Sequence, residues 1–79
     1  MIKDLQEENY TELRAIAAYH MSKLGWSQAK LAPKCRMTQT TMSKKLQNPR
    51  LFRYDELLRL CTVLQFDDAE RSIVMGVKT

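Results

Sequence analysis

The middle of this 79-residue sequence lacks acidic side chains, because neither aspartate nor glutamate occurs from residue 13 to residue 54. The same stretch holds nine lysines and arginines, and the acidic residues collect in the flanking segments 4–12 and 55–70. A segment of one charge sign is typical of a surface that meets a polyanion such as nucleic acid. A basic solvated surface with no partner is the alternative that the charge alone leaves open.

Histidine and cysteine are scarce. His20 is the only histidine, and Cys35 and Cys61 lie far apart, so the sequence has no zinc-site spacing. We expect both cysteines to be buried free thiols, and His20 to be a half-buried core residue with a local hydrogen bond. The sequence also has no paired-carboxylate site, no Ser-His-Asp arrangement and no glycine-rich phosphate loop. It therefore predicts neither an enzyme nor a cofactor.

No long apolar run is present either. No stretch approaches the about 20 apolar residues that cross a membrane, and no signal peptide is visible after Met1. Apolar residues nevertheless make up 44% of the chain, which is ordinary for a folded domain. We therefore expect one small domain over residues 1–79, in the cytoplasm and without membrane contact.

Helical signals fill the chain, strand signals are missing, and we expect an all-α domain of about five helices. The apolar face of the first helix recurs at three- and four-residue spacing and comprises Leu13, Ile16, Ala17, His20, Met21 and Leu24. Gly25 supplies a left-handed end to this helix. Capping-box patterns at Asp4 and Asn9 leave its start open. It begins near residue 5, or near residue 10 after an arm formed by residues 1–9.

Residues 27–47 carry two helix starts that lie only eleven residues apart. Ser27 and Thr38 are good N-caps, because each hydroxyl can accept a hydrogen bond from an amide of the opening turn. Apolar residues flank both caps at the spacing of a hydrophobic staple. We therefore expect short helices over residues 28–35 and 39–47 that meet at a corner, as in a helix-turn-helix. Pro33 lies beyond the first turn, so the first of these helices should kink there or start later.

The remaining elements follow Asn48-Pro49, which ends the helix over residues 39–47. We expect residues 48–53 to form a loop from which Leu51 and Phe52 can fill the core. A fourth helix should cover residues 54–65, and its expected inward residues are Leu57, Leu58, Leu60, Cys61 and Leu64. Asp67 and Glu70 form a capping-box pattern that begins a fifth helix, and Gly76 ends it.

The helix expected over residues 39–47 has an outward face without a carboxylate. Met42 and Leu46 form its inner stripe, and the opposite face carries Gln39, Thr40, Ser43, Lys44 and Gln47. A solvated helix face usually includes glutamate or aspartate. Hydrogen-bonding side chains with one cation are instead suited to an acceptor-rich, negatively charged surface such as the major groove of DNA.

This stretch resembles the helix-turn-helix of the lambda-repressor-like family, the phage repressors, Cro proteins and XRE-type regulators. The family pattern begins with Gln, has Leu-Ala at its fourth and fifth positions, and then has a hydroxyl cap and an apolar residue. The matching residues here are Gln28, Leu31, Ala32, Thr38 and Met42, followed by the basic stretch 43–45. Downstream, Asn48-Pro49 and residues 55–59 also resemble phage members of the family.

Three residues depart from the family pattern. Arg36 stands where the turn usually has glycine, and a left-handed residue other than glycine costs about 1–2 kcal/mol. We therefore expect a wider turn at this position. Lys45 stands where an apolar residue is common, with Leu46 taking over its packing, and Pro33 is also atypical.

The resemblance implies a sequence-specific double-stranded DNA-binding transcriptional regulator of repressor or Cro type, in a bacterial or phage-infected cell. In the family, the second helix of the motif lies in the major groove. Carried onto this chain, the residues that read base edges are Gln39, Thr40, Ser43 and Lys44. The implied phosphate contacts are Gln28, Lys30, Lys34, Thr38, Thr41, Lys45, Arg50 and Arg53.

Two further points are left open by the sequence. Family members commonly pair on palindromic sites, so we expect a homodimer on DNA. Residues 67–79 would form the contact, through Ile73, Val74, Met75 and Val77, unless these residues cap the monomer's own core. The alternative function is a small protein-interaction module, such as an antitoxin or anti-repressor. No small-molecule substrate is expected for either function.

Overall fold

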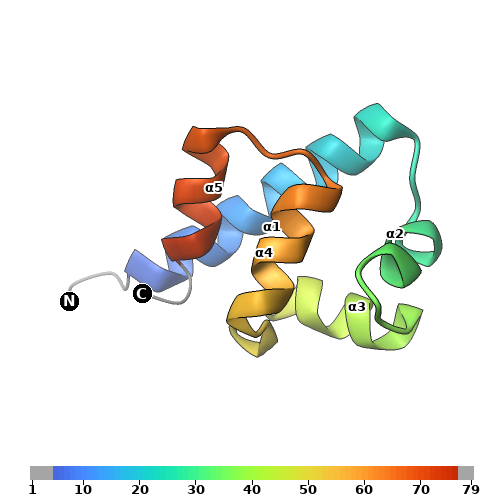
Figure 1. Ribbon diagram of the computed structural model, residues 1–79. Coiled ribbons are helices and arrows are strands. Elements are labelled where there is room, and N and C mark those ends of the chain that lie inside the picture. Colours follow the sequence, from blue (N-terminus) through green and yellow to red (C-terminus); the bar gives the residue numbers. More distant parts are fainter. Residues whose placement is uncertain (1–4, 77–79) are drawn as a thin grey trace.

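The computed structural model describes residues 5–76 and arranges them as five α-helices and one 3-10 turn (Figure 1). These elements are α1 (Leu5–Leu24), α2 (Gln28–Lys34), α3 (Gln39–Gln47), η1 (Pro49–Leu51), α4 (Tyr54–Val63) and α5 (Asp68–Met75). No strand occurs in this range, so the expected all-α single domain is confirmed. None of the described helices is long and apolar enough to cross a membrane.

One three-residue turn is repeated at three of the helix junctions. A left-handed residue ends one helix, an apolar residue follows it, and a capping residue begins the next helix. The three copies are Gly25-Trp26-Ser27, Arg36-Met37-Thr38 and Gln65-Phe66-Asp67. In each copy the amide of the apolar residue donates to the carbonyl five residues before it, at 2.9 Å. The left-handed residue donates to the carbonyl three residues before it, which completes a Schellman motif.

The apolar residue of each turn points into the core. Phe66 is buried, and Trp26 and Met37 are half-buried against the same cluster of core residues. The single side chain therefore anchors the end of one helix and the beginning of the next. This shared anchor explains how three or four residues suffice to join α1 to α2, α2 to α3, and α4 to α5.

The turn at Arg36 is not wider than the other two, so the expectation of a wider turn is wrong. Arg36 has a φ of 61°, close to the 70° of Gly25, so the turn keeps its length and accepts the left-handed strain. The later start considered for the proline-containing helix is also wrong, because α2 begins directly after Ser27. α2 then ends one residue after Pro33, which leaves little helix for the missing amide to disturb.

The predicted helix caps are confirmed. The Ser27 and Thr38 hydroxyls accept from the amides of Lys30 and Thr41, at 3.4 and 3.1 Å. Asp67 and the glutamate three residues later exchange side-chain-to-amide bonds of 2.8 and 3.0 Å. α1 begins at residue 5, so residues 5–9 are helical, and the alternative of an arm through residue 9 is wrong. The cap expected at residue 4 lies outside the described part of the chain.

The core is one cluster drawn from every helix. It comprises Leu13, Ala17, Leu31, Ala32, Cys35, Met42, Leu46, Phe52, Leu57, Leu60, Cys61, Leu64, Phe66 and Val74. Two residues expected to point inward are exposed instead, Leu51 and Leu58. The first is turned outward because η1 buries Pro49 and Phe52 on either side of it. The second lies off the stripe formed by Leu57, Leu60, Cys61 and Leu64, since neighbouring residues of a helix point about 100° apart.

α4 is also shorter than expected. It ends at Val63 instead of residue 65, and Leu64 is its C-cap. Gln65 takes a left-handed φ of 61° and opens the third of the repeated turns. No glycine marks this position, so the end of the helix had no clear signal in the sequence.

His20 joins α1 to α5. Its Nε2 atom lies 2.9 and 3.0 Å from the two carboxylate oxygens of Glu70, and its ring packs against Phe66 with a centroid distance of 5.0 Å. The expectation of a half-buried residue is confirmed, but the expectation of a local hydrogen bond is wrong, because the partner lies fifty residues away. The contact holds α5 against α1.

Both cysteines are buried free thiols, as expected. Burial raises the pKa of Cys35 to about 11, although the nearby Arg59 charge acts in the opposite direction. Burial raises the pKa of Cys61 as well. A thiol reacts as its thiolate, so neither side chain is activated near neutral pH.

We predict opposite changes in stability at the two left-handed positions, Gly25 and Arg36. Gly25→Ala should lower the free energy of unfolding by about 1 kcal/mol. Nothing lies within 4 Å of the added carbon, so the unfavourable φ alone causes the loss. Arg36→Gly should raise the free energy of unfolding by up to about 1 kcal/mol, because it removes the same strain. Urea denaturation measures both changes.

The control is Arg36→Ala, which removes the charge and keeps the left-handed strain. If Arg36→Gly and Arg36→Ala raise the free energy of unfolding equally, the prediction is contradicted.

Candidate nucleic-acid interface

α3 lies with one side in the core and the other in solvent. Met42 and Leu46 are buried, as expected. The opposite side carries the polar residues expected to face outward: Gln39, Thr40, Lys44 and Gln47 are exposed and Ser43 is half-exposed. Burial of the inner stripe holds the helix rigidly, so these polar side chains project from a fixed position.

The N-terminal end of α3 has both a cap and open amides. The Thr38 hydroxyl accepts from the Thr41 amide and donates its own hydrogen to the Thr41 hydroxyl at 2.9 Å. Its one hydrogen is therefore used within the cap, whereas the Thr41 hydroxyl still has a hydrogen to donate. The backbone amides of Gln39 and Thr40 precede the first helical hydrogen bond and have no acceptor within the helix. Together with the outward side chains, they make this end of α3 rich in donors.

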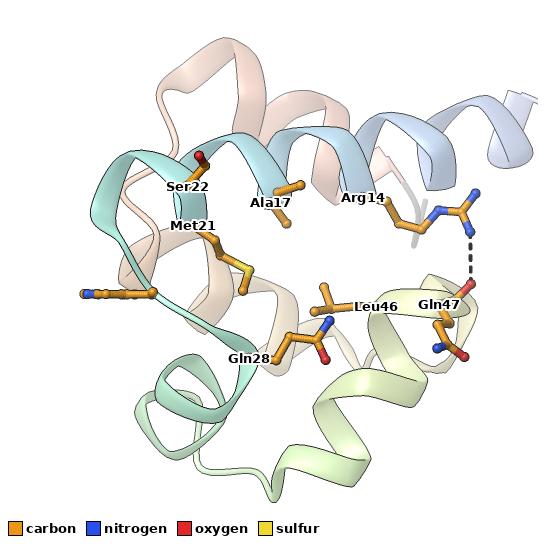
Figure 2. Close-up of a pocket in the computed structure, with 9 residues that line it drawn as sticks. Arg14, Ala17, Met21, Ser22, Gln28, Leu46 and Gln47 are labelled. Carbon is orange, nitrogen blue, oxygen red and sulfur yellow. Dashed lines mark hydrogen bonds between the residues drawn. The ribbon is translucent and has the colours of Figure 1, made fainter.

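A groove of about 480 Å³ separates α1 from the beginning of α2 and the end of α3 (Figure 2). Its apolar lining comes from Ala17, Ala18, Met21, Trp26 and Leu46, and its polar lining comes from Arg14, Ser22, Gln28 and Gln47. Figure 2 shows the Gln28 amide pointing into the groove from the α2 side. Gln28, expected from the sequence to bind phosphate, is therefore half-buried beside the apolar lining.

Arg14 is a cation that sequence reasoning left out of the site. Its Nη1 atom donates to the backbone oxygen of Gln47 at 3.2 Å, which joins α1 to the end of α3 (Figure 2). A guanidinium has five N–H donors, so this one bond leaves others available to a partner. A signal was present in the sequence, because Arg14 follows the buried Leu13 and must lie on the flank of the apolar face of α1.

The other cations of the acid-free segment differ in their surroundings. Within residues 10–76, neither Lys30 nor Lys44 has a side-chain hydrogen bond or ion pair, and both are exposed. Lys34 lies over the Trp26 ring, with its Nζ atom 4.8 Å from the ring centroid. Arg50 is exposed and lies 6.0 Å from the centroid of a tyrosine ring of α1. These four cations keep their positive charge at the surface.

Lys45 and Arg53 are different, because each has an acidic neighbour. The Lys45 ammonium donates to both carboxylate oxygens of Glu56, at 2.5 and 2.7 Å, and its side chain is only 16% exposed. Arg53 lies 3.6 Å from Asp55 in a fully solvated pair, which has little strength. The Lys45 charge is thus balanced inside the protein, and this residue joins α3 to α4.

Glu56 is bound from two sides. Its carboxylate accepts from the Arg53 amide at 2.8 Å as well as from Lys45. Burial raises the pKa of Glu56, but the hydrogen bonds from these two partners outweigh burial and hold the pKa below its ordinary value of 4.5. The carboxylate therefore stays ionised at neutral pH and keeps the link between α3 and α4 intact.

The surface around α3 has the chemistry of a donor-rich, positively charged face. Its outward groups are amides, hydroxyls, one ammonium group and open backbone N–H groups, and the nearest carboxylate, that of Glu56, is already bonded to Lys45. No protein-family model, curated protein or solved structure matches the chain. A partner of this face must therefore be inferred from the side chains themselves, which favour an acceptor-rich polyanion.

We predict that Glu56→Gln lowers stability in a pH-dependent way. At pH 7 the free energy of unfolding should fall by about 1–2 kcal/mol, because a charged hydrogen-bond acceptor is lost. The pKa of Glu56 is lowered by folding, so its contribution is present above pH 4.5 and is lost as pH falls through the folded-state pKa. The difference from wild type should therefore shrink as the pH falls below 4.5, as measured by thermal or urea unfolding.

The matched control is Asp55→Asn, which removes a solvated carboxylate one residue away. Its effect at pH 7 should be clearly smaller, since the Arg53–Asp55 pair is exposed. Equal losses in the two variants, or a Glu56→Gln loss that persists unchanged at pH 3, would show that the Lys45–Glu56 pair is not a source of stability.

Proposed function

We propose that the protein is a sequence-specific double-stranded DNA-binding regulator and that α3 enters the major groove. In this proposal, α2, the turn at residues 36–38 and α3 form a helix-turn-helix. The observation that carries the proposal is the outward side of α3, where Gln39, Thr40, Ser43 and Lys44 project from a helix packed on the core. They include donors and acceptors of the kind that read base edges, and no carboxylate repels the phosphates.

The spacing of these side chains fits a short stretch of bases. Gln39 and Lys44 are separated by five residues, or about 7.5 Å of helix rise, which spans about two base-pair steps of 3.4 Å. A glutamine amide can pair with adenine N7 and N6, and a lysine with guanine O6 and N7. Thr40 and Ser43 lie between them and can adjust to either base. One copy of α3 would therefore read two or three neighbouring base pairs.

The phosphate contacts of the proposal come from the cations that remain at the surface. Lys30, Lys34 and Arg50 are exposed cations on α2 and on η1, which directly follows α3. Arg14 joins this set because it lies beside the groove between α1 and α3. Such contacts position the protein without reading sequence. Of the phosphate contacts expected from the sequence, Lys45 is the weakest candidate, since binding DNA would compete with its bond to Glu56.

A single α3 reads few base pairs, so the proposed working form on DNA is a homodimer on a palindromic site, with half-sites about 34 Å apart. Of the apolar residues expected to join the two copies, Val74 is fully buried, Met75 packs against the core and Ile73 is half-exposed. Val77 lies outside the described residues. The buried members favour the alternative that this segment caps the monomer's core.

A protein-interaction module is the second candidate function. It is favoured by three exposed apolar side chains on η1 and α4, Leu51, Tyr54 and Leu58, which DNA binding does not require. A salt titration with random duplex separates the two functions. A DNA binder loses affinity steeply with rising salt, because it releases counterions from the duplex. Absence of measurable duplex binding at about 50 mM salt would reject the DNA proposal and leave the second candidate.

We predict that Gln39→Ala and Lys44→Ala relax base preference. After selection of sites from a random DNA pool, each variant should lose discrimination at one or two base pairs, by about 1–3 kcal/mol each. Gln65→Ala and Lys23→Ala are controls with the same chemical changes at exposed positions away from α3. If the two α3 variants select the wild-type consensus with unchanged strength, this face of α3 does not read the bases.

We predict a different effect from the phosphate set. Lys30→Ala should weaken binding to specific and random duplex about equally. The slope of log binding constant against log salt concentration, called the salt slope below, should become less steep by about one unit. Arg71→Ala removes a cation from α5, which lies on the opposite side of α4 from α3 (Figure 1), and should leave the slope unchanged. Lys45→Ala should also change the salt slope of DNA binding little, because the Lys45 charge is paired with Glu56. A wild-type slope in Lys30→Ala would remove this residue from the interface.

A further inference from the structure

Three of the four large apolar side chains that are exposed among the described residues gather in one part of the chain, and the fourth, Tyr19, lies on α1 with 57% exposure. Tyr54 is 61% exposed, Leu51 50% and Leu58 37%, and all three belong to η1 and α4. Tyr54 and Leu58 are four residues apart on α4, so they lie on one face of that helix. Exposed apolar residues scattered singly need no explanation, but neighbours on one face mark a contact surface.

A shallow groove of about 290 Å³ continues this face toward the end of α4. It is lined by Asp55, Leu58, Arg59, Thr62 and Val63. Leu58 belongs to both the exposed set and the groove, so the two features are continuous. We name this surface, formed by the exposed residues between Leu51 and Val63, the α4 outer face.

The charges of the α4 outer face differ from those around α3. Asp55 and Arg59 carry opposite charges one helical turn apart. Within residues 10–76, the Arg59 guanidinium has no hydrogen bond or ion pair, and Asp55 has only the solvated contact with Arg53 at 3.6 Å. The face thus carries the acid Asp55 beside two bases, Arg53 and Arg59, whereas the outward side of α3 carries no carboxylate. A face of mixed charge with exposed apolar side chains is less suited to a polyanion. It is suited to a protein surface with the same pattern in the reverse order.

We propose that the α4 outer face binds a second copy of this chain, with the two α4 helices antiparallel about a two-fold axis near Leu58. A two-fold axis makes each copy present the same surface to the other. In the antiparallel arrangement, Asp55 of each copy comes within about 5 Å, along the helix axis, of Arg59 of the other. Two ion pairs then flank the contact between the apolar side chains. A parallel arrangement would instead bring like charges together, which electrostatic repulsion disfavours.

The size of the face predicts a weak dimer. The described surface of the whole domain is only 5166 Å², and stable interfaces bury about 1,200–2,000 Å² in total. One helix face and the preceding turn form only a small part of that surface. Self-association should therefore appear at high protein concentration and become stronger when two copies bind neighbouring half-sites.

The face is well placed to fix the spacing of two α3 helices. η1 follows α3 after one residue, and the Lys45–Glu56 pair holds α3 against α4. Contact between two α4 helices would therefore set the distance and direction between the two copies of α3. Only this consequence rests on the proposed DNA-binding function, because self-association needs no DNA.

The test uses charge exchange between two variants, Asp55→Arg and Arg59→Glu. Each should weaken self-association at least about tenfold, because each brings like charges together across the axis. An equimolar mixture of the two should associate again to within a few-fold of wild type, since every altered side chain then faces an opposite charge. Sedimentation equilibrium over a wide concentration range measures all three samples, with circular dichroism as the check on folding.

Two further variants locate the contact. Leu58→Asp should abolish association, whereas Ile73→Asp, on α5, should leave it unchanged. A wild type that stays monomeric at the highest concentration, a mixture no better associated than its components, or loss of association in Ile73→Asp but not in Leu58→Asp would each overturn the proposal. Binding of wild type to a random duplex is measured separately. Its absence would reject the DNA proposal and leave the self-association result standing.

Discussion

The left-handed residue at each repeated turn is the constraint on which the rest of the structure depends. It lets an apolar side chain enter the core one residue later and a capping side chain begin the next helix two residues later. The three helix junctions therefore need only three or four residues each and contain their own hydrogen bonds. In the turn between α2 and α3 this position is held by Arg36, which keeps the same geometry as Gly25 in spite of its side chain. The outward direction of α3 follows from that turn and from the burial of Met42 and Leu46.

The polar surface is divided by a single ion pair. Lys45 and Glu56 bond to each other across α3 and α4, so each cancels the other's charge where the two surfaces meet. On one side of the pair lie the donor-rich side of α3 and the exposed cations, for which we propose DNA. On the other side lies the α4 outer face, with balanced charges and exposed apolar residues, for which we propose a second copy of the chain. The pair also joins the two helices, so it fixes the position of one surface relative to the other.

Much of this arrangement is local and could be predicted from the sequence. The caps at Ser27, Thr38 and Asp67 depend only on side chains within one helical turn, and all three are confirmed. The inner stripe of α3 follows from 3.6-residue periodicity, which is also local. The same holds for the composition of the outward side of α3, because its residues are defined once the inner stripe is known.

Other features depend on contacts between distant parts of the chain. The partner of His20 is Glu70, which no local pattern could identify, and the partner of Lys45 is set by how α4 crosses α3. Leu51 is as apolar as its buried neighbour Phe52, and only the packing of this segment decides which of the two is exposed. The sequence by itself determined the helices, their caps and the polar side of α3, because periodicity and capping act within a few residues. Tertiary structure alone decided which charges are already paired and which apolar side chains are left at the surface, because both depend on the neighbours that folding brings together.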